Sequence, residues 1–258
     1  MEYKRFNLFI LWNMKIIAIW DIHWRTTWKD IVLKNNFDIV VFIWDYFDTY
    51  EDISIDQQVK NFHDILEFKK NNRDKVIMLL WNHDYQYLDF VDEVYSWFNP
   101  VTKLQVSKVL TESLEWWLIQ MAYQYWKLLF THAWVSLSWY TSLIWREYNQ
   151  LNDDEIWEIA DNINNIVDVW WMQAFSFYRW DKSYTWDNKD QSPIWIRPKA
   201  LCSDMIEWIT YVSWHTEQKD IMVIKHEVMD SKLILIDCLW NWKFFEADID
   251  WDNINYCE

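Results

Sequence analysis

Residues 15–23 read Lys-Ile-Ile-Ala-Ile-Trp-Asp-Ile-His, an apolar run that ends at a carboxylate and an imidazole two positions apart. Four later segments repeat this pattern, because each is apolar and soon gives way to polar residues. A run of this kind predicts a buried strand whose first polar side chains emerge at its end. The later runs are residues 37–43 before Asp45, 76–80 before Asn82, 128–130 before His132, and 210–212 before His215.

The polar residues at these strand ends are expected to lie together. In layered α/β architectures the strand ends share one edge, so side chains from five distant segments can converge there. Carboxylate, amide and imidazole ligands suit two hard or borderline divalent ions, and Asp45 is our candidate for a carboxylate shared by both. The candidate metal ligands are Asp21, His23, Asp45, Asn82, His132 and His215.

The glycine and tryptophan contents are abnormal. The chain has no Gly and 24 Trp in 258 residues, whereas ordinary usage would give roughly 18 Gly. A turn that brings backbone close to a ligand often needs positive φ and no Cβ, which Trp cannot supply without strain. We therefore hypothesise that most Trp residues stand where Gly belongs, with Trp28 and Trp195 as candidates for genuine Trp. Trp20, Trp44 and Trp81 directly precede candidate ligands, and Trp24, Trp134 and Trp214 lie within two residues of the three ligand histidines.

Five short motifs, read with Gly in place of Trp, carry a family resemblance. WDIHW at 20–24 resembles GDxHG, WDYFD at 44–48 resembles GDxxD, WNHD at 81–84 resembles GNH[DE], THAW at 131–134 resembles [TG]HAG, and SWHT at 213–216 resembles GHT. In this order they are similar to the calcineurin-like metallophosphoesterases, and most of all to the serine/threonine-phosphatase-like branch. The resemblance implies an α/β fold with two central β-sheets packed together and flanked by helices.

The resemblance also implies roles for the residues at the strand ends. Asp21, His23 and Asp45 would hold one ion, and Asp45, Asn82, His132 and His215 the other. His83 would protonate the leaving oxygen, and Asp48 would orient His83. Pairing with a carboxylate favours the charged imidazole, which raises its pKa.

The sequence departs from the protein-phosphatase pattern at one point. That branch continues GDxxDRG, with its Arg on the phosphate, whereas Thr49-Tyr50 follows Asp48 here. Another cation must then bind the phosphate. Arg25 is one candidate, and Arg197 is the other because residues 192–198 resemble an [WI]RP element of bacterial and phage relatives. Arg suits bidentate phosphate recognition, although either could form a surface ion pair instead.

The function that these features favour is hydrolysis of a phosphomonoester, with water held between two metal ions as the nucleophile. We expect Mn²⁺, with Fe or Zn²⁺ as alternatives, because the ligand set does not select among them. A phosphodiesterase or diadenosine tetraphosphate hydrolase is the alternative enzyme. A catalytically degenerate phosphatase fold that serves as a binding scaffold is the alternative from another class.

Length and charge limit the remaining possibilities. The chain fits a single domain over residues 1–258, with residues 1–13 as a possible N-terminal extension and residues 137–200 as a lid-like insertion or a helical buttress. A net charge of −16 argues against a nucleic-acid surface. No apolar run approaches the roughly 20 residues of a membrane span. The three Cys residues lack metal-type spacing, which favours free thiols and a cytoplasmic location.

The rest of the chain shows helical and strand periodicity. Helices are expected at 26–34 and 56–70, and a helix that begins with a capping box at Asn152 and Glu155 is expected to continue to 167. Paired strands are expected at 115–123 and 125–130, and further strands at 221–226, 233–237 and 243–246. His63 is expected on the surface, and His226 is expected to be a hydrogen-bonded structural residue.

Overall fold

A computed structural model describes residues 14–20, 22, 24–43, 45–49, 51–96, 98–147, 151–166, 172–176, 187–213, 219–236, 244–249 and 254–257. The expectation for residues 1–13 lies outside this part of the chain. The strands are β1 (Met14–Ile19), β2 (Ile39–Ile43), β3 (Val76–Leu79), β4 (Ala122–Tyr125), β5 (Leu128–Thr131), β6 (Thr210–Ser213), β7 (Met222–Lys225), β8 (Lys232–Leu235), β9 (Phe245–Ile249) and β10 (Ile254–Cys257).

Helices separate many of these strands. They are α1 (Thr27–Lys34), α2 (Ile55–Asn71), α3 (Asn82–Tyr85), α4 (Lys103–Glu115), α5 (Leu137–Leu143), α6 (Asp153–Trp157), α7 (Ile159–Asn164), the 3₁₀ helix η2 (Met172–Phe175) and α8 (Pro198–Leu201). None of the helices in the described ranges is long and apolar enough to cross a membrane.

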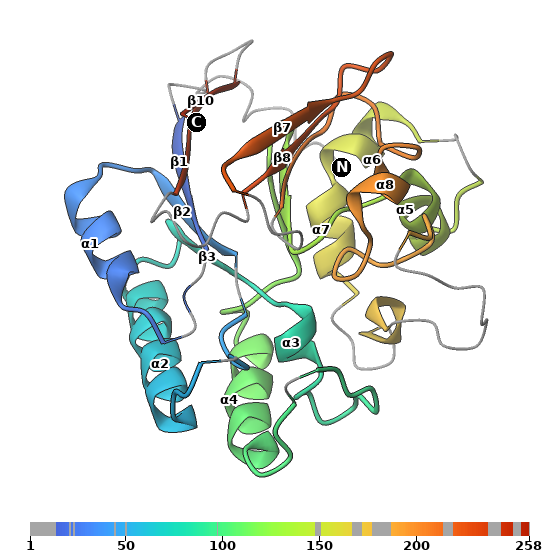
Figure 1. The fold of residues 1–258 in the computed structure, drawn as a ribbon. Helices are drawn as coiled ribbons and strands as arrows, with labels where there is room; N and C mark the ends of the chain where they lie inside the picture. The colour runs from blue at the N-terminus through green and yellow to red at the C-terminus, as the bar shows by residue number, and fades with distance from the viewer. Residues whose placement is uncertain are drawn as a thin grey trace, which may run out of the picture.

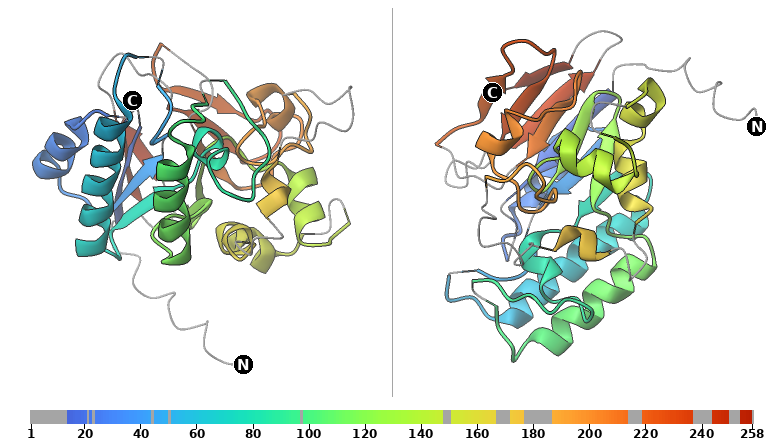
Figure 2. Two further views of the ribbon diagram at one scale, coloured as in Figure 1. Left: turned by 90° about the horizontal axis from the view of Figure 1, so that it is seen from below. Right: turned by 90° about the vertical axis from the view of Figure 1, so that its right-hand side faces the viewer.

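The strands form two five-stranded mixed sheets. The first has the order β10-β9-β1-β2-β3, and the second has the order β4-β5-β6-β8-β7. In the first sheet β1, β2 and β3 are parallel, and in the second β5, β6 and β8 are parallel. The two halves of the chain lie side by side, as the colours in Figures 1 and 2 show. The rings of Phe130 in β5 and Phe245 in β9 have centroids 6.3 Å apart, so the two sheets meet in a common core.

Helices pack on the outside of each sheet. Trp28 of α1 and Phe68 of α2 pack on Phe42 of β2, with ring centroids 5.6 and 6.4 Å from that of Phe42. The helices α1, α2 and α4 gather on this side of the molecule (Figure 1). On the second sheet α7 packs against the edge strand β4, where Asn164 accepts hydrogen bonds from the amides of Met121 and Ala122 at 2.9 and 3.0 Å. The expected fold of two packed sheets flanked by helices is confirmed.

Most of the expected elements are present, but three differ. The expected strand over 115–123 is wrong, because residue 115 ends helix α4 and the strand begins only at 122. The capping box at Asn152 and Glu155 is confirmed, yet the expected single helix over 153–167 is two helices that meet at Glu158. Strand β10 was not expected, and the expected strand over 125–130 begins at 128 because 126 and 127 form a turn.

Backbone conformation bears on the tryptophan anomaly. Five described residues have positive φ, and four of them are Trp: Trp117, Trp126, Trp145 and Trp208 have φ of 55°, 52°, 56° and 67°. All four occupy positions that favour Gly. Trp117 and Trp145 follow α4 and α5 at the left-handed position of a Schellman motif. Trp126 opens the two-residue β4–β5 turn, and Trp208 is the third residue of a turn closed by Ile209 N to Ile206 O.

Candidate active site

The strand ends bring three of the expected ligands to one region. Asp45 follows β2 and Asn82 follows β3, and because these strands are parallel neighbours their ends share one edge. His132 directly follows β5 in the other sheet. Its ring lies 4.0 Å from that of Trp81, the residue before Asn82, so the two sheets meet here. Asp21, His23 and His215 lie outside the described residues.

Asp45 is a buried carboxylate whose charge is poorly compensated by the described part of the protein. Its side chain is 5% exposed, and its Oδ1 has no hydrogen-bond partner among the described residues. Burial raises the pKa of Asp45 to about 7, the charge of His83 opposes this shift, and the charge of Asp48 adds to it. A bound cation would supply the missing compensation.

The donor types at these positions fit a divalent cation. Asp45 offers carboxylate oxygen, Asn82 amide oxygen and His132 imidazole nitrogen, and such a mixed set suits Mn²⁺, Fe or Zn²⁺. Asn82 and His132 are 4% and 1% exposed, so a cation held there would be shielded from solvent. Within the described ranges alone, no group of three His, Cys, Asp or Glu side chains could hold an ion. The set therefore requires residues from outside those ranges.

A histidine and a carboxylate lie beside these ligands. Nδ1 of His83 lies 3.5 Å from Oδ2 of Asp48, and the two side chains are 13% and 4% exposed. Burial alone would lower the pKa of His83, but the carboxylates of Asp45 and Asp48 outweigh burial and raise it. Burial raises the pKa of Asp48, although hydrogen bonds from His83 and Tyr87 oppose that shift. This pair can store and deliver a proton.

Asp84 holds the loop that carries Asp45 and Asp48. Its Oδ1 accepts hydrogen bonds from the backbone amides of Tyr46 and Phe47 at 3.0 and 3.2 Å. The side chain is fully buried. Burial and the charge of Asp45 raise the pKa of Asp84 well above its ordinary value. Asp84 therefore joins the start of α3 to the loop after β2.

Sequence reasoning included Asp84 in the WNHD motif without giving it a role, and it missed Gln86 and Tyr87. Asp84, Gln86 and Tyr87 are all fully buried and all contact the loop that contains Asp48. The signal for Asp84 was its place in that motif, and the only signal for Gln86 and Tyr87 was their position shortly after it. No periodicity distinguishes them from surface residues, because they lie in a short helix and the turn that follows it.

The two candidate phosphate-binding arginines differ in their surroundings. Arg25 forms an ion pair with Glu51, with 2.5 Å between Nη2 and Oε1, and its guanidinium lies 5.5 Å from the ring of Trp24. Arg197 is half-buried at the N-cap of α8. The segment before it contacts the metal-ligand region directly, because the amide of Ala133 donates to the carbonyl of Pro193 at 2.7 Å.

The two remaining histidines lie elsewhere. His63 is exposed on α2, as expected. Nδ1 of His226 accepts hydrogen bonds from the amides of Val228 and Met229 at 3.2 and 3.0 Å. It is a structural residue, as expected, although it lies just after β7 and not inside the strand.

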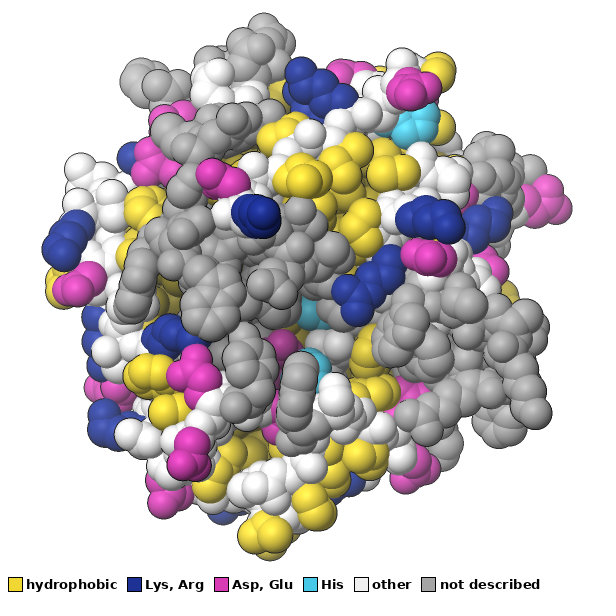
Figure 3. All heavy atoms as spheres, viewed as in Figure 1, with side chains coloured by type: hydrophobic (Ala, Val, Ile, Leu, Met, Phe, Trp, Pro, Cys, Tyr) yellow, Lys and Arg dark blue, Asp and Glu magenta, His cyan; other side chains and the backbone are white. Residues whose placement is uncertain are grey.

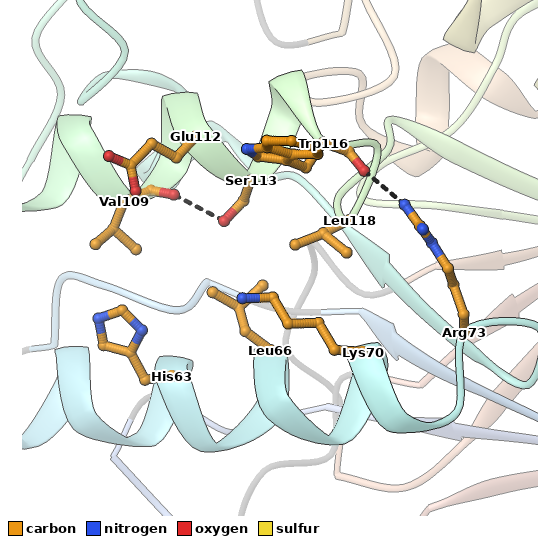
Figure 4. Close-up of a pocket in the computed structure, with 9 residues that line it drawn as sticks. All are labelled: His63, Leu66, Lys70, Arg73, Val109, Glu112, Ser113, Trp116 and Leu118. Carbon is orange, nitrogen blue, oxygen red and sulfur yellow. Dashed lines mark hydrogen bonds between the residues drawn. The ribbon is translucent and has the colours of Figure 1, made fainter.

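The surface carries a group of histidine and acidic side chains and, away from the expected site residues, a cavity. Histidine and acidic side chains reach the surface together near the middle of the face shown in Figure 3. A separate cavity of about 340 Å³ lies between α2 and α4 (Figure 4). None of the expected site residues lines it. Its lining includes Leu66, Lys70 and Arg73, and the guanidinium of Arg73 donates to the carbonyl of Trp116.

Comparison with known proteins supports the fold. No family model matches the sequence, and no curated protein matches it. Among solved structures the chain is similar to a cold-active protein-tyrosine phosphatase of the psychrophile Shewanella sp., with 13% identity, a TM-score of 0.52, and coverage of 94% of this chain and 77% of the other. A metallophosphoesterase from Sphaerobacter thermophilus matches with 10% identity, a TM-score of 0.44, and coverage of 95% and 87%. The chain therefore shares its two-sheet α/β fold with the Shewanella phosphatase.

Proposed function

We propose that the protein hydrolyses phosphomonoesters with the help of two divalent metal ions. The observation that supports this most is that Asp45, Asn82 and His132 follow strands whose ends adjoin, with the His83–Asp48 pair beside them. Three metal-ligand types and a proton donor thus lie at adjoining strand ends. Asp21, His23 and His215 complete the proposed ligand set.

Each group has a separate task in the proposed reaction. The two ions, when bound, would supply Lewis-acid activation of water and neutralise charge on the phosphoryl oxygens. His83 gives a proton to the leaving oxygen, which prevents an unstable alkoxide from building up. Asp48 keeps the imidazole oriented. The donor set does not select the metal, and Mn²⁺ is the first to test.

Arg197 is the proposed phosphate-binding residue. The contact between Ala133 and Pro193 supports this role, because it holds the segment before Arg197 against the residue that follows His132. Arg25 is the weaker candidate, because the carboxylate of Glu51 already engages its guanidinium. Within residues 137–200 the helices α6 and α7 buttress strand β4. We assign the substrate-selecting role of this insertion to residues 187–197.

The test is hydrolysis of p-nitrophenyl phosphate and of its bis-ester, with and without Mn²⁺. We expect Mn²⁺-dependent hydrolysis, with the monoester as the better substrate. Asp45→Asn and His132→Ala should each lower kcat/KM by at least about 100-fold, because each removes a metal ligand. His226→Ala is the matched histidine control and should retain activity. A preference for the bis-ester would favour a phosphodiesterase, and no hydrolysis of any phosphate ester by metal-loaded protein would favour a binding scaffold.

We also propose that most Trp residues stand where the functional protein has Gly, through codon reassignment or replacement. The four Trp residues with positive φ support this. Trp134, two residues after His132, supports it too. Its indole nitrogen is buried and has no hydrogen-bond partner among the described residues. By contrast, the indole nitrogens of Trp28 and Trp195 donate to Asn61 and Phe175, both at 3.1 Å, which supports genuine Trp there.

Reading the codons of the gene and sequencing the native protein by mass spectrometry test this second proposal. We expect Gly in the native peptides at positions 117, 126, 145 and 208, and Trp at 28 and 195. Ordinary tryptophan codons together with Trp in the native peptides at the first four positions would contradict the proposal.

A further inference from the structure

We propose that Tyr87 and Gln86 are positioning residues for the proton-donating histidine, and that they act through Asp48. This inference rests on the proposed function. Its hydrogen bonds involve no Trp side chain, and Trp195, which packs on Tyr95, is one of the two candidates for genuine Trp.

Asp48 needs external support for its conformation. Its φ is 62°, in the left-handed region that residues other than Gly seldom occupy. Asp tolerates this region better than most residues, but such a conformation persists only where the surroundings hold it. Both oxygens of its buried carboxylate are engaged: Oδ1 accepts from the hydroxyl of Tyr87, and Oδ2 accepts from the amide nitrogen of Gln86.

Other hydrogen bonds orient the Tyr87 hydroxyl and the Gln86 amide so that both donate to Asp48. The hydroxyl oxygen of Tyr87 accepts a hydrogen bond from the backbone amide of Asn99 at 3.0 Å, which leaves its proton for Asp48. The side-chain oxygen of Gln86 accepts from the amide of Tyr95 at 2.7 Å, which turns its NH₂ group toward Asp48. A backbone amide from the loop after α3 therefore fixes the orientation of each donor.

This arrangement fixes the position of His83. With Oδ1 of Asp48 held by Tyr87, Oδ2 remains 3.5 Å from Nδ1 of His83. The amide nitrogen of Gln86 lies 3.5 Å from the same Nδ1, but both nitrogens are donors in this arrangement, so the Nδ1–H bond is directed at Asp48. With Nδ1 held in this way, Nε2 is the nitrogen left for substrate. As the P–O bond breaks, the leaving oxygen takes the Nε2 proton, and the imidazole becomes neutral with Nδ1–H still facing Asp48.

The network also reaches the segment of Arg197. Tyr95, whose amide orients Gln86, packs its ring against that of Trp195 in an edge arrangement with centroids 4.3 Å apart. Trp195 is buried two residues before Arg197. The proton donor and the proposed phosphate-binding segment therefore share one supporting cluster, which would keep their spacing constant.

The test compares substrates that differ in their need for a proton. Phenyl phosphate has a poor leaving group and needs the acid, whereas 2,4-dinitrophenyl phosphate does not. Tyr87→Phe removes one hydroxyl and should lower kcat for phenyl phosphate by about 10- to 100-fold. For dinitrophenyl phosphate it should lower kcat less than about threefold, with KM little changed for both. Tyr85→Phe is the matched control, because the Tyr85 hydroxyl lies 3.1 Å from the Ser176 hydroxyl. It should leave kcat for both substrates unchanged.

Two further variants separate positioning from general damage. Gln86→Met should show the same dependence on the leaving group, and it replaces Tyr87→Phe should the latter not fold. In a double mutant, His83→Ala should abolish the effect of Tyr87→Phe, because both act through one proton. Equal losses on both substrates, or additive losses in the double mutant, would overturn the inference while leaving the phosphatase function intact. A wild-type protein with metal that hydrolyses neither ester would overturn the proposed function and this inference together.

Discussion

Asp84 shows how one buried side chain can organise the site. It receives two backbone hydrogen bonds from the loop between Asp45 and Asp48, although burial and the nearby Asp45 charge disfavour its ionised form. A neutral carboxyl group can still accept these hydrogen bonds through its carbonyl oxygen. The hydrogen bonds make Asp84 an acceptor, and its raised pKa favours the neutral form.

This distinction predicts different effects for two substitutions of Asp84. Asp84→Asn keeps an acceptor oxygen and should change the free energy of unfolding by less than about 1 kcal/mol. Asp84→Ala leaves the amides of Tyr46 and Phe47 buried without an acceptor and should cost about 2–4 kcal/mol. Urea denaturation of the metal-free variants measures both. Equal destabilisation by Asn and Ala would show that the charge matters after all.

At the residue scale the sequence identified the candidate ligands, but it did not identify the residues that hold the His83–Asp48 pair in place. Asp45, Asn82 and His132 could be identified because each follows an apolar run of strand length. Gln86 and Tyr87 could not, because their importance depends on the left-handed conformation of Asp48, a tertiary feature without a local sequence signal. The positions of Asp21, His23 and His215 stay predictions.

At the scale of secondary structure, two elements were mispredicted, the strand over 115–123 and the single helix over 153–167. The first lacked a helix-ending residue in the sequence, and the second is interrupted by a tertiary contact. Helix α4 ends in a Schellman motif whose left-handed residue is Trp117, where the usual Gly signal would have marked the end. Residues 115–123, which are mostly apolar and lack that signal, therefore resembled a strand. The split between α6 and α7 has another cause: the side chain of Gln124 on β4 donates to the carbonyl of Ile156 and accepts from the amide of Ala160, which interrupts the helix.

The same reasoning predicts opposite effects of replacing two Trp residues by Gly. Trp117→Gly should stabilise the protein by about 1 kcal/mol, because it relieves a left-handed conformation at an exposed residue. Trp28→Gly should destabilise it by about 3–5 kcal/mol, because Trp28 is buried against Phe42 and Phe68. Thermal unfolding of the polypeptide with Trp at both positions and of each variant provides the comparison. Destabilisation by Trp117→Gly would argue that this Trp is native.

At the scale of the whole molecule, the sheet packing was predictable and the completed site was not. The apolar runs that became β1, β2, β3, β5 and β6 fixed which strands are buried, and the family resemblance supplied their two-sheet arrangement. What the runs could not give is the spacing between the sheets at the strand ends. That spacing depends on how side chains pack between the sheets, and the contact between Trp81 and His132 is one example.

The two-sheet architecture predicts that metal binding stabilises the whole fold. The proposed ligands come from both sheets, so a cation held between them would favour the folded state by mass action. Mn²⁺ at about 100 times its Kd should raise Tm by about 5–10 °C. EDTA should reverse the shift, and Asp45→Asn should abolish it while His226→Ala retains it. An equal shift in wild type and Asp45→Asn would place the stabilising ion elsewhere.

The most direct measurement of the proposed metal centre is anomalous diffraction at the manganese edge from crystals of the native polypeptide grown with Mn²⁺. We predict two anomalous peaks about 3.5–4 Å apart, with Asp45 touching both, Asn82 and His132 touching one, and Asp21, His23 and His215 completing the coordination. Peaks at other places, or a single peak that Asp45 does not touch, would contradict the two-metal site at the shared strand ends.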